Sequence, residues 1–182
     1  VVVPSDPYSV KGLLAAAIRD DDPVFLVNDK KLINLTGFVP DEEYVIELGK
    51  GRYMRRGTDV TLVGMSYTSV VCQKAAEQLA ESGIDAEVID MMSLSPFDED
   101  ILIESVAKTN NVVIVDEDTP RASMSSEFAA VIADKAFDHL DSPVKRVTSP
   151  HSPVPYNSAL EQAFMPQPED IVQTVRGMLG RD

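Results

Sequence analysis

Three consecutive aspartates, Asp20, Asp21 and Asp22, follow an apolar helical pattern and precede Pro23. Carboxylates just beyond a helix C-terminus face backbone carbonyls that lack partners, which is unfavourable for anions. A hard cation would relieve this arrangement, because such ions bind carboxylate and carbonyl oxygens together. The spacing therefore indicates either a cation site or a polar turn that is exposed to solvent.

The other reactive side chains form no recognisable catalytic set. His139 and His151 have no neighbouring ligand pair at metal spacing. Cys72 falls near the apolar face of an expected helix, where we expect a small core residue rather than a nucleophile. A GMS turn after the first regular strand could bind an anion with its backbone amides. We expect instead an ordinary strand-to-helix turn in which Ser66 or Thr68 caps the helix.

The elements that carry these residues fall into two groups. In the first group, short β-branched or apolar runs at residues 1–3 and 24–27 flank a helix that is capped by Ser5 or Asp6. Two strands joined through a helix predict a βαβ crossover, the remnant of one α/β domain. Residues 28–43 contain a glycine and a proline and predict a linker to a second domain.

From Tyr53 onwards the pattern becomes regular. Apolar strands alternate with helical patterns of about 10 to 15 residues, which predicts an α/β domain with a doubly wound, mostly parallel sheet. The expected strands are residues 59–64, 86–90, 112–116 and 144–148. The expected helices are residues 68–81 and 168–179, with one more that is capped by Asp98 and another that starts at Ser125 or Ser126.

Composition excludes several classes of partner. The 182 residues carry 30 acidic and 16 basic side chains, and the net charge of -14 repels the phosphate backbone of a nucleic acid. No apolar run approaches the roughly 20 residues of a membrane helix, so we expect no membrane partner. A single cysteine allows no disulfide within the chain, which suits a cytoplasmic location. The opening VVVPSDPYS differs from a signal peptide and reads as a strand within a longer parent chain.

A family resemblance rests on five segments that cover nearly the whole chain. In order, they are VVVPSDPYSVKGLLAAAIRDDDPVF, EYVIELGKG, GTDVTLVG, AEVIDMMSLSPFDEDILIESVAKTNNVVIVDED and SPVPYNSALEQAFMPQPEDIV. Together they resemble the β subunit of the thiamine-diphosphate-dependent component of pyruvate, branched-chain 2-oxo acid and acetoin dehydrogenases. Such enzymes decarboxylate a 2-oxo acid, or cleave acetoin, and transfer the acyl group to lipoamide.

The resemblance implies two parts of unequal size. Residues 1–45 would be the end of the pyrimidine-binding domain plus its linker, and residues 46–182 would be the transketolase C-terminal domain. In the family, the glutamate that activates the cofactor lies earlier in the pyrimidine-binding domain. No residue of this chain is therefore expected to be catalytic, and the chain alone should be inactive. Thiamine diphosphate and magnesium would belong to the intact enzyme and would not be bound by this chain alone.

The resemblance also implies one ion site and several protein partners. Family members hold potassium with the helix end that matches AIRDDD, which points to the carbonyls of Ala17, Ile18 and Asp20, with Asp22 at a position where asparagine is common. Asp141, in LDSPVKRV, matches an acidic residue that docks the basic subunit-binding domain of the dihydrolipoyl acyltransferase. Opposite charges would speed that association. The other expected partners are the α subunit and a second β subunit.

One departure from the family leaves alternatives open. The segment LVNDKKLINLTGF has Asn28 where relatives often carry an acid, and it lacks their tyrosine. The chain could instead be a stand-alone interaction module of the same fold without activity. It could also belong to another thiamine enzyme, such as a transketolase or a deoxyxylulose-phosphate synthase. Those enzymes need basic residues that reach a sugar phosphate, and the C-terminal segment shows no clear basic cluster apart from Arg52, Arg55 and Arg56, so we rank this alternative last.

Overall fold

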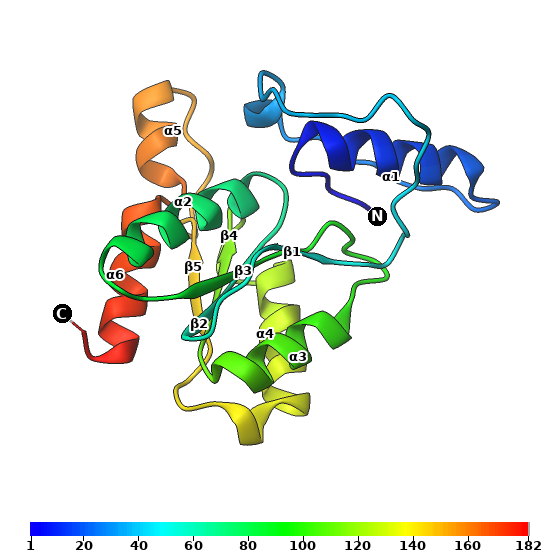
Figure 1. Cartoon of the computed structure of the whole chain (residues 1–182). Coiled ribbons are helices and arrows are strands. Elements are labelled where there is room, and N and C mark those ends of the chain that lie inside the picture. Colours follow the sequence, from blue (N-terminus) through cyan, green and yellow to red (C-terminus); the bar gives the residue numbers. More distant parts are fainter. Residues whose placement is uncertain (182) are drawn as a thin grey trace.

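The computed structural model describes residues 1–181, and a five-stranded sheet forms its centre (Figure 1). In spatial order the strands are β1 (Arg52–Arg55), β3 (Ala86–Asp90), β2 (Val60–Gly64), β4 (Val112–Asp116) and β5 (Lys145–Thr148). Neighbouring strands are parallel, except that β1 runs antiparallel to β3. The prediction of a mostly parallel sheet is confirmed, and all four predicted strands agree with the structure to within one residue.

Helices cover both faces of the sheet, as the doubly wound prediction requires. They are α2 (Tyr67–Glu81) and α6 (Pro168–Leu179) on one face, and α3 (Glu99–Thr109) and α4 (Met124–Lys135) on the other. Alternate residues of a strand face opposite sides of a sheet. In β4, Val113 and Val115 accordingly pack with α2 and α6, whereas Val112 and Ile114 pack with α3 and α4. Burial on both faces explains why this strand is apolar throughout.

Helix starts follow their sequence signals in most places. Asp6 caps α1 (Pro7–Arg19) by accepting the Ser9 N–H at 2.7 Å, and Asp98 accepts the Ile101 N–H at 3.4 Å. The helix α4 begins at Met124, one or two residues before the predicted start at Ser125 or Ser126. None of the helices within residues 1–181 is long and apolar enough to cross a membrane.

The turn between β2 and α2 differs from the prediction that a hydroxyl caps the helix. Ser66 has a φ of 51° and its side chain makes no capping hydrogen bond. Its Oγ instead donates to the carbonyl of Pro4 at 3.1 Å. Thr68 accepts the N–H of Met65, which precedes the helix, at 3.0 Å. This turn therefore ties the N-terminal segment to the sheet.

The predicted strands at residues 1–3 and 24–27 are wrong as regular strands. Val2 forms only isolated bridges, one parallel to Leu26 and one antiparallel to Ser93. The helix α1 connects these two parallel segments, as in a βαβ crossover. The continuous series of hydrogen bonds that would make the segments regular strands is missing. Val2 packs with Leu13 and Met92 in a small core of its own.

Two elements were not predicted, the edge strand β1 and the short helix α5 (Ser158–Phe164). Asn157 caps α5 by accepting the N–H groups of Ala159 and Leu160 at 3.0 and 3.3 Å. Residues 28–43 are irregular apart from the 3-10 helix η1 (Lys30–Leu32), and another short 3-10 helix, η2 (Phe137–His139), precedes β5. Figure 1 shows α1, η1 and α5 beyond the end of the sheet at which β4 and β5 terminate.

Candidate functional site

The aspartates that follow α1 lie on the surface at the C-terminal end of that helix. Ala17 and Ile18 belong to its last turn, and Ile18 is 76% exposed. Asp20 is the C-cap, and its Oδ1 accepts the backbone N–H of Asp22 at 2.9 Å. Carbonyls in the last turn of a helix have no helical partner, so oxygen atoms that suit potassium are present here. Within residues 1–181, no group of three or more histidine, cysteine or acidic side chains could hold a metal.

Asp141, the predicted docking residue, is exposed in the turn before β5. Its backbone N–H donates to the carbonyl of Asn110 at 2.9 Å, which fixes the turn. The turn lies at the amino end of β5, whereas α1 lies beyond the carboxyl ends of the strands (Figure 1). The structure therefore does not bring the two predicted sites together.

Cys72 and the two histidines differ in their surroundings. Cys72 is fully buried within the core between the sheet and α2, so its predicted role as a core residue is confirmed. Burial raises the pKa of its thiol, which leaves the nucleophilic thiolate disfavoured. His139 and His151 are both exposed.

A cavity of about 600 Å³ lies where β2 and β4 end side by side. The chain passes from β2 to β3 on one side and returns to β4 on the other, so this is the switch point of the doubly wound sheet. Ser66 after β2 and Asp116 at the end of β4 line the cavity. Residues 27–31 close it from the N-terminal segment, and Glu161 of α5 completes the wall.

Acidic side chains dominate this switch-point cavity. Asp116 is 3% exposed, and its Oδ2 accepts the N–H of Ser125 at 3.1 Å. The N-terminus of α4 is therefore already occupied by a carboxylate of the chain itself. Lys31 forms an ion pair with Glu161 at 2.8 Å and lies over the ring of Tyr67.

Glu117 and Asp29 bring two carboxyl groups together at the rim of the cavity. Glu117 lies at the exposed rim, yet its neighbours displace enough water to raise its pKa to about 7. The charges of Asp29 and Asp116 act in the same direction, and Lys31 opposes them. Asp29 accepts the N–H of Lys31 with Oδ1 at 2.7 Å, whereas its Oδ2 is buried without a hydrogen-bond partner.

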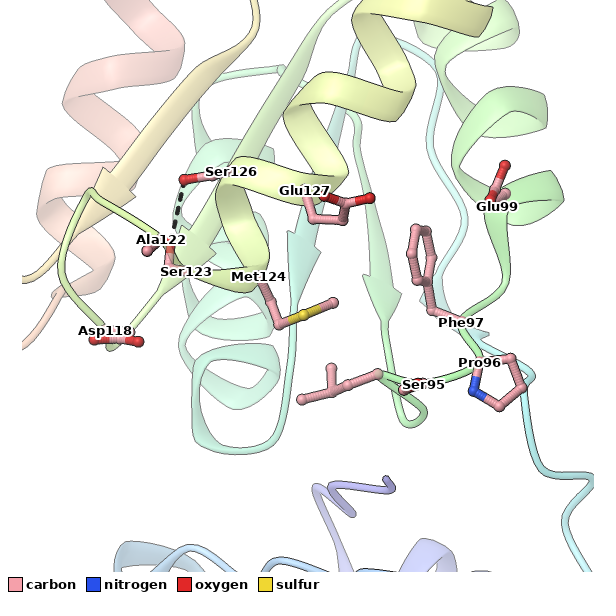
Figure 2. Close-up of a pocket in the computed structure, with 11 residues that line it drawn as sticks. Ser95, Pro96, Phe97, Glu99, Asp118, Ala122, Ser123, Met124, Ser126 and Glu127 are labelled. Atoms are coloured by element: carbon pink, nitrogen blue, oxygen red, sulfur yellow. Dashed lines mark hydrogen bonds between the residues drawn. The ribbon is translucent and has the colours of Figure 1, made fainter.

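A second, more open groove of about 830 Å³ adjoins the first. Figure 2 shows Met124 at the start of α4 and Phe97 before α3 on its walls. The ring of Phe97 packs edge-on against Phe128, with centroids 5.1 Å apart. Glu99 on the rim is paired with Lys135 of α4. The groove is thus an apolar surface with a partly neutralised acidic rim.

A buried ion pair joins the N-terminal segment to the sheet. Asp90 has no exposed side-chain surface and accepts hydrogen bonds from Ser5 Oγ at 2.5 Å, Ser69 Oγ at 2.7 Å and Arg52 Nε at 3.0 Å. Arg52 also donates to Asp6 at 2.8 Å. Burial raises the pKa of Asp90, although Arg52 and the two hydroxyls lower it.

Sequence reasoning missed both the Asp90 ion pair and the Asp29–Glu117 contact. The available signals were an aspartate at the end of the buried strand AEVID and the acidic run after VVIVD. Polar residues that end buried parallel strands gather at one edge of the sheet, where ligands and polar networks are found.

The strand order, the antiparallel edge strand and the two helical layers define the chain as a doubly wound domain of the transketolase C-terminal type. Residues 49–171 match the family model described as "Transketolase, C-terminal domain". The chain belongs to this family, and the fold expected from the resemblance is confirmed.

Among curated proteins, similarity is high to dehydrogenase β subunits. The chain is 50% identical to the acetoin:2,6-dichlorophenolindophenol oxidoreductase subunit beta of Bacillus subtilis (strain 168), over 98% of this chain and 52% of that subunit. It is 41% identical to the pyruvate dehydrogenase E1 component subunit beta of the same organism, over 98% of this chain and 55% of that subunit. The chain therefore spans about half the length of the curated relatives it matches.

Among solved structures, the fold is similar to that of a "Split gene transketolase, inactive beta4 tetramer", with a TM-score of 0.79 and 26% identity, and the match covers 98% of this chain and 56% of that one.

Proposed function

We propose that the chain is the C-terminal part of a β subunit of a thiamine-diphosphate-dependent acetoin or 2-oxo acid dehydrogenase. The observation that carries this proposal is the 50% identity to an acetoin oxidoreductase β subunit over 98% of the chain. Identity to the pyruvate dehydrogenase β subunit of the same organism is lower, at 41%. We therefore favour acetoin as the substrate of the intact enzyme, which would transfer the acyl group to lipoamide in a cytoplasmic complex.

Within that enzyme, residues 1–45 would complete the pyrimidine-binding domain and residues 46–182 would form the assembly domain. Among residues 1–181, ten of the fourteen exposed large apolar side chains lie in residues 1–45, a quarter of the chain. Ile18, Ile33 and Phe38 are 76%, 79% and 84% exposed. A concentration of this kind is typical of a surface that another protein segment covers. The partners that would cover it are the rest of the β subunit, the α subunit and a second β subunit.

Thiamine diphosphate does not fit the cavity that this chain forms by itself. Asp29, Asp116, Glu117 and Asp118 line it, and their charges would repel a diphosphate. The N–H of Ser125 at the start of α4 already binds a carboxylate. The cofactor and its magnesium would therefore be held by other parts of the intact enzyme.

Potassium fits the chemistry of the α1 terminus better. The carbonyls of Ala17, Ile18 and Asp20 and the carboxylate of Asp22 are hard oxygen ligands of the type that alkali and alkaline-earth ions prefer. If they hold potassium in the intact enzyme, replacing potassium with sodium should lower its melting temperature. The variant Asp22→Ala should lose that difference, and an equal melting temperature in both salts would contradict the assignment.

Asp141 would dock the basic subunit-binding domain of the acyltransferase. The residue is exposed, and the net charge of -14 favours a basic partner. Asp141→Asn should slow association with that domain, and added salt should shrink the difference. Glu127→Asn, an exposed acid on α4, serves as the control. Equal association rates for both variants would argue against this surface.

The test of the main proposal is co-expression of the full-length β protein with the α subunit encoded beside it. Thiamine-dependent reduction of dichlorophenolindophenol with acetoin, and weaker reduction with pyruvate, is the expected result. A complex without activity toward either substrate would favour the alternative of a stand-alone module. Activity with ketose phosphates would favour a transketolase-type enzyme.

A further inference from the structure

Two carboxyl groups from distant parts of the chain meet at the rim of the switch-point cavity. Asp29 belongs to the irregular segment before η1, and Glu117 directly follows β4. Both side chains line this cavity, and desolvation together with their interaction raises the pKa of Glu117. Oδ1 of Asp29 is satisfied by the N–H of Lys31, but Oδ2 is cut off from water and has no donor.

An ionised carboxylate can only accept hydrogen bonds, so two of them cannot satisfy each other. A shielded carboxylate oxygen without a donor is unfavourable. A protonated Glu117 would donate to Oδ2 of Asp29 and satisfy it. The contact is therefore complete when the pair holds one proton, and it is incomplete when both groups are ionised.

The other charged groups around the pair do not replace this proton. Lys31 is held by Glu161 of α5 at 2.8 Å, and Lys30 is exposed beside it. After β4, the carboxylate of Asp116 accepts N–H groups from Asp118 and Ser125 at 3.0 and 3.1 Å. Asp118 and Glu161 add further negative charge to the same wall, which favours the protonated form of the pair.

We propose that Asp29 and Glu117 share one proton, and that this shared proton holds residues 28–32 against the carboxyl end of β4. The segment would be latched at mildly acidic pH and released at alkaline pH. Because the segment forms one wall of the switch-point cavity, its release would open the cavity toward solvent. The proposal does not depend on the enzyme to which the chain belongs.

The direction of this pH dependence follows from the raised pKa of Glu117. An acid whose pKa is higher in the closed form stabilises that form fully below its ordinary pKa of 4.5, and the effect is lost as the pH rises through about 7. The full difference between the ordinary pKa of 4.5 and the raised pKa of about 7 would favour the closed form by at most about 300-fold. Solvent at the exposed rim weakens such effects, so we expect a change of roughly 10-fold.

Trypsin can report on the latch, because it cleaves after Lys30 and Lys31 within the closed segment. We would compare the full-length protein with Glu117→Gln, whose amide donates to Asp29 at every pH. Dividing the cleavage rate of the unchanged protein by that of Glu117→Gln removes the pH dependence of trypsin itself. The ratio should be near one at about pH 6 and rise to roughly 10 at about pH 8.5. Glu127→Gln should behave like the unchanged protein. A ratio that stays constant with pH would overturn the proposal.

A carbon-13 titration of the glutamate carboxyl groups tests the shared proton directly. The Glu117 signal, identified by its loss in Glu117→Gln, should titrate near neutral pH. In Asp29→Asn the neighbouring charge is gone and an amide donor is present, so the Glu117 midpoint should move down by at least about one pH unit. A midpoint in the usual glutamate range in the unchanged protein would overturn the proposal, whatever the activity of the complex.

Discussion

Replacing Arg52 with methionine should destabilise the chain by about 3–5 kcal/mol, because Asp90 would keep a buried charge without its partner. Arg52 contributes a 3.0 Å hydrogen bond to Asp90, and it also bonds Ser5 and Asp6 at 2.9 and 2.8 Å. The hydroxyls of Ser5 and Ser69 still donate to Asp90 in the variant, which favours the lower half of that range. Urea unfolding followed by circular dichroism at about pH 7 measures the change in the free energy of unfolding.

Arg55 on the same strand provides a matched control. The two arginine side chains are almost equally exposed, at 24% and 26%, but the partner of Arg55, Asp85, is 47% exposed whereas Asp90 is 0% exposed. Arg55→Met should therefore lower the free energy of unfolding by at most about 1 kcal/mol. Each arginine also makes other hydrogen bonds, Arg52 to Ser5 and Asp6 and Arg55 to the carbonyl of Ala86. Equal losses in the two variants would refute the reasoning, since only Arg52 has a fully buried acidic partner.

The pH dependence gives a second, independent readout for Arg52→Met. Burial holds the pKa of Asp90 above its ordinary value, so its contribution to stability is full below that value and is lost as the pH rises. Removing Arg52 takes away the charge that lowers this pKa, so ionising Asp90 costs more in the variant. The loss of unfolding free energy caused by Arg52→Met should therefore be larger at about pH 8 than at about pH 5. Adding Asp90→Asn should restore about 2 kcal/mol in a double-mutant cycle. A deficit that grows on acidification would contradict this account.

Four further predictions concern packing and burial. Gly57→Ala should lower the free energy of unfolding by at least about 3 kcal/mol, because the added Cβ would lie 2.3 Å from the backbone of Ala86. In Gly177→Ala, within α6, the added Cβ would contact no other atom, and the variant should be up to about 1 kcal/mol more stable. Phe128→Ala should cost about 3–5 kcal/mol in the same urea assay. Cys72 should react with Ellman's reagent only after unfolding, even at alkaline pH, because burial raises its pKa; fast labelling of the native chain would contradict this.

The interior strands could be predicted because they are buried on both faces. Such strands read as short continuous apolar runs, as in VTLVG and VVIVD. The edge strand β1 lacks this signal, since RYMR carries two charges that bind neighbouring acids. Charged side chains are a common way to protect an edge strand, and they hide it from a search for apolar runs.

Hydrophobic periodicity in the sequence does not predict isolated bridges or the short helix α5. Val2 was expected in a strand because it is β-branched and apolar, but it pairs with only one residue on each side. The seven residues of α5 are too few for a helical period to stand out, and the cap at Asn157 is a signal that many turns share. Local patterns therefore predict elements whose stability comes from a continuous buried face.

The Asp29–Glu117 pair could not be predicted in this way, because neither residue carries a local signal for the other. Their contact depends on where the irregular segment before η1 crosses the sheet edge, and tertiary packing determines that path. The potassium residues and Asp141 came from the family resemblance, and the structure shows only that they are accessible at opposite ends of the domain.

The buried ion pair gives the exposed apolar surface of residues 1–45 a fixed orientation. Arg52 and Asp90 belong to the sheet, whereas Ser5 and Asp6 belong to the N-terminal segment, so their hydrogen bonds hold α1 to the domain. A preorganised surface loses less conformational freedom when it binds. Arg52→Met should therefore weaken assembly with a partner subunit even where the sheet remains folded. Arg55→Met leaves those bonds intact and should leave assembly unchanged.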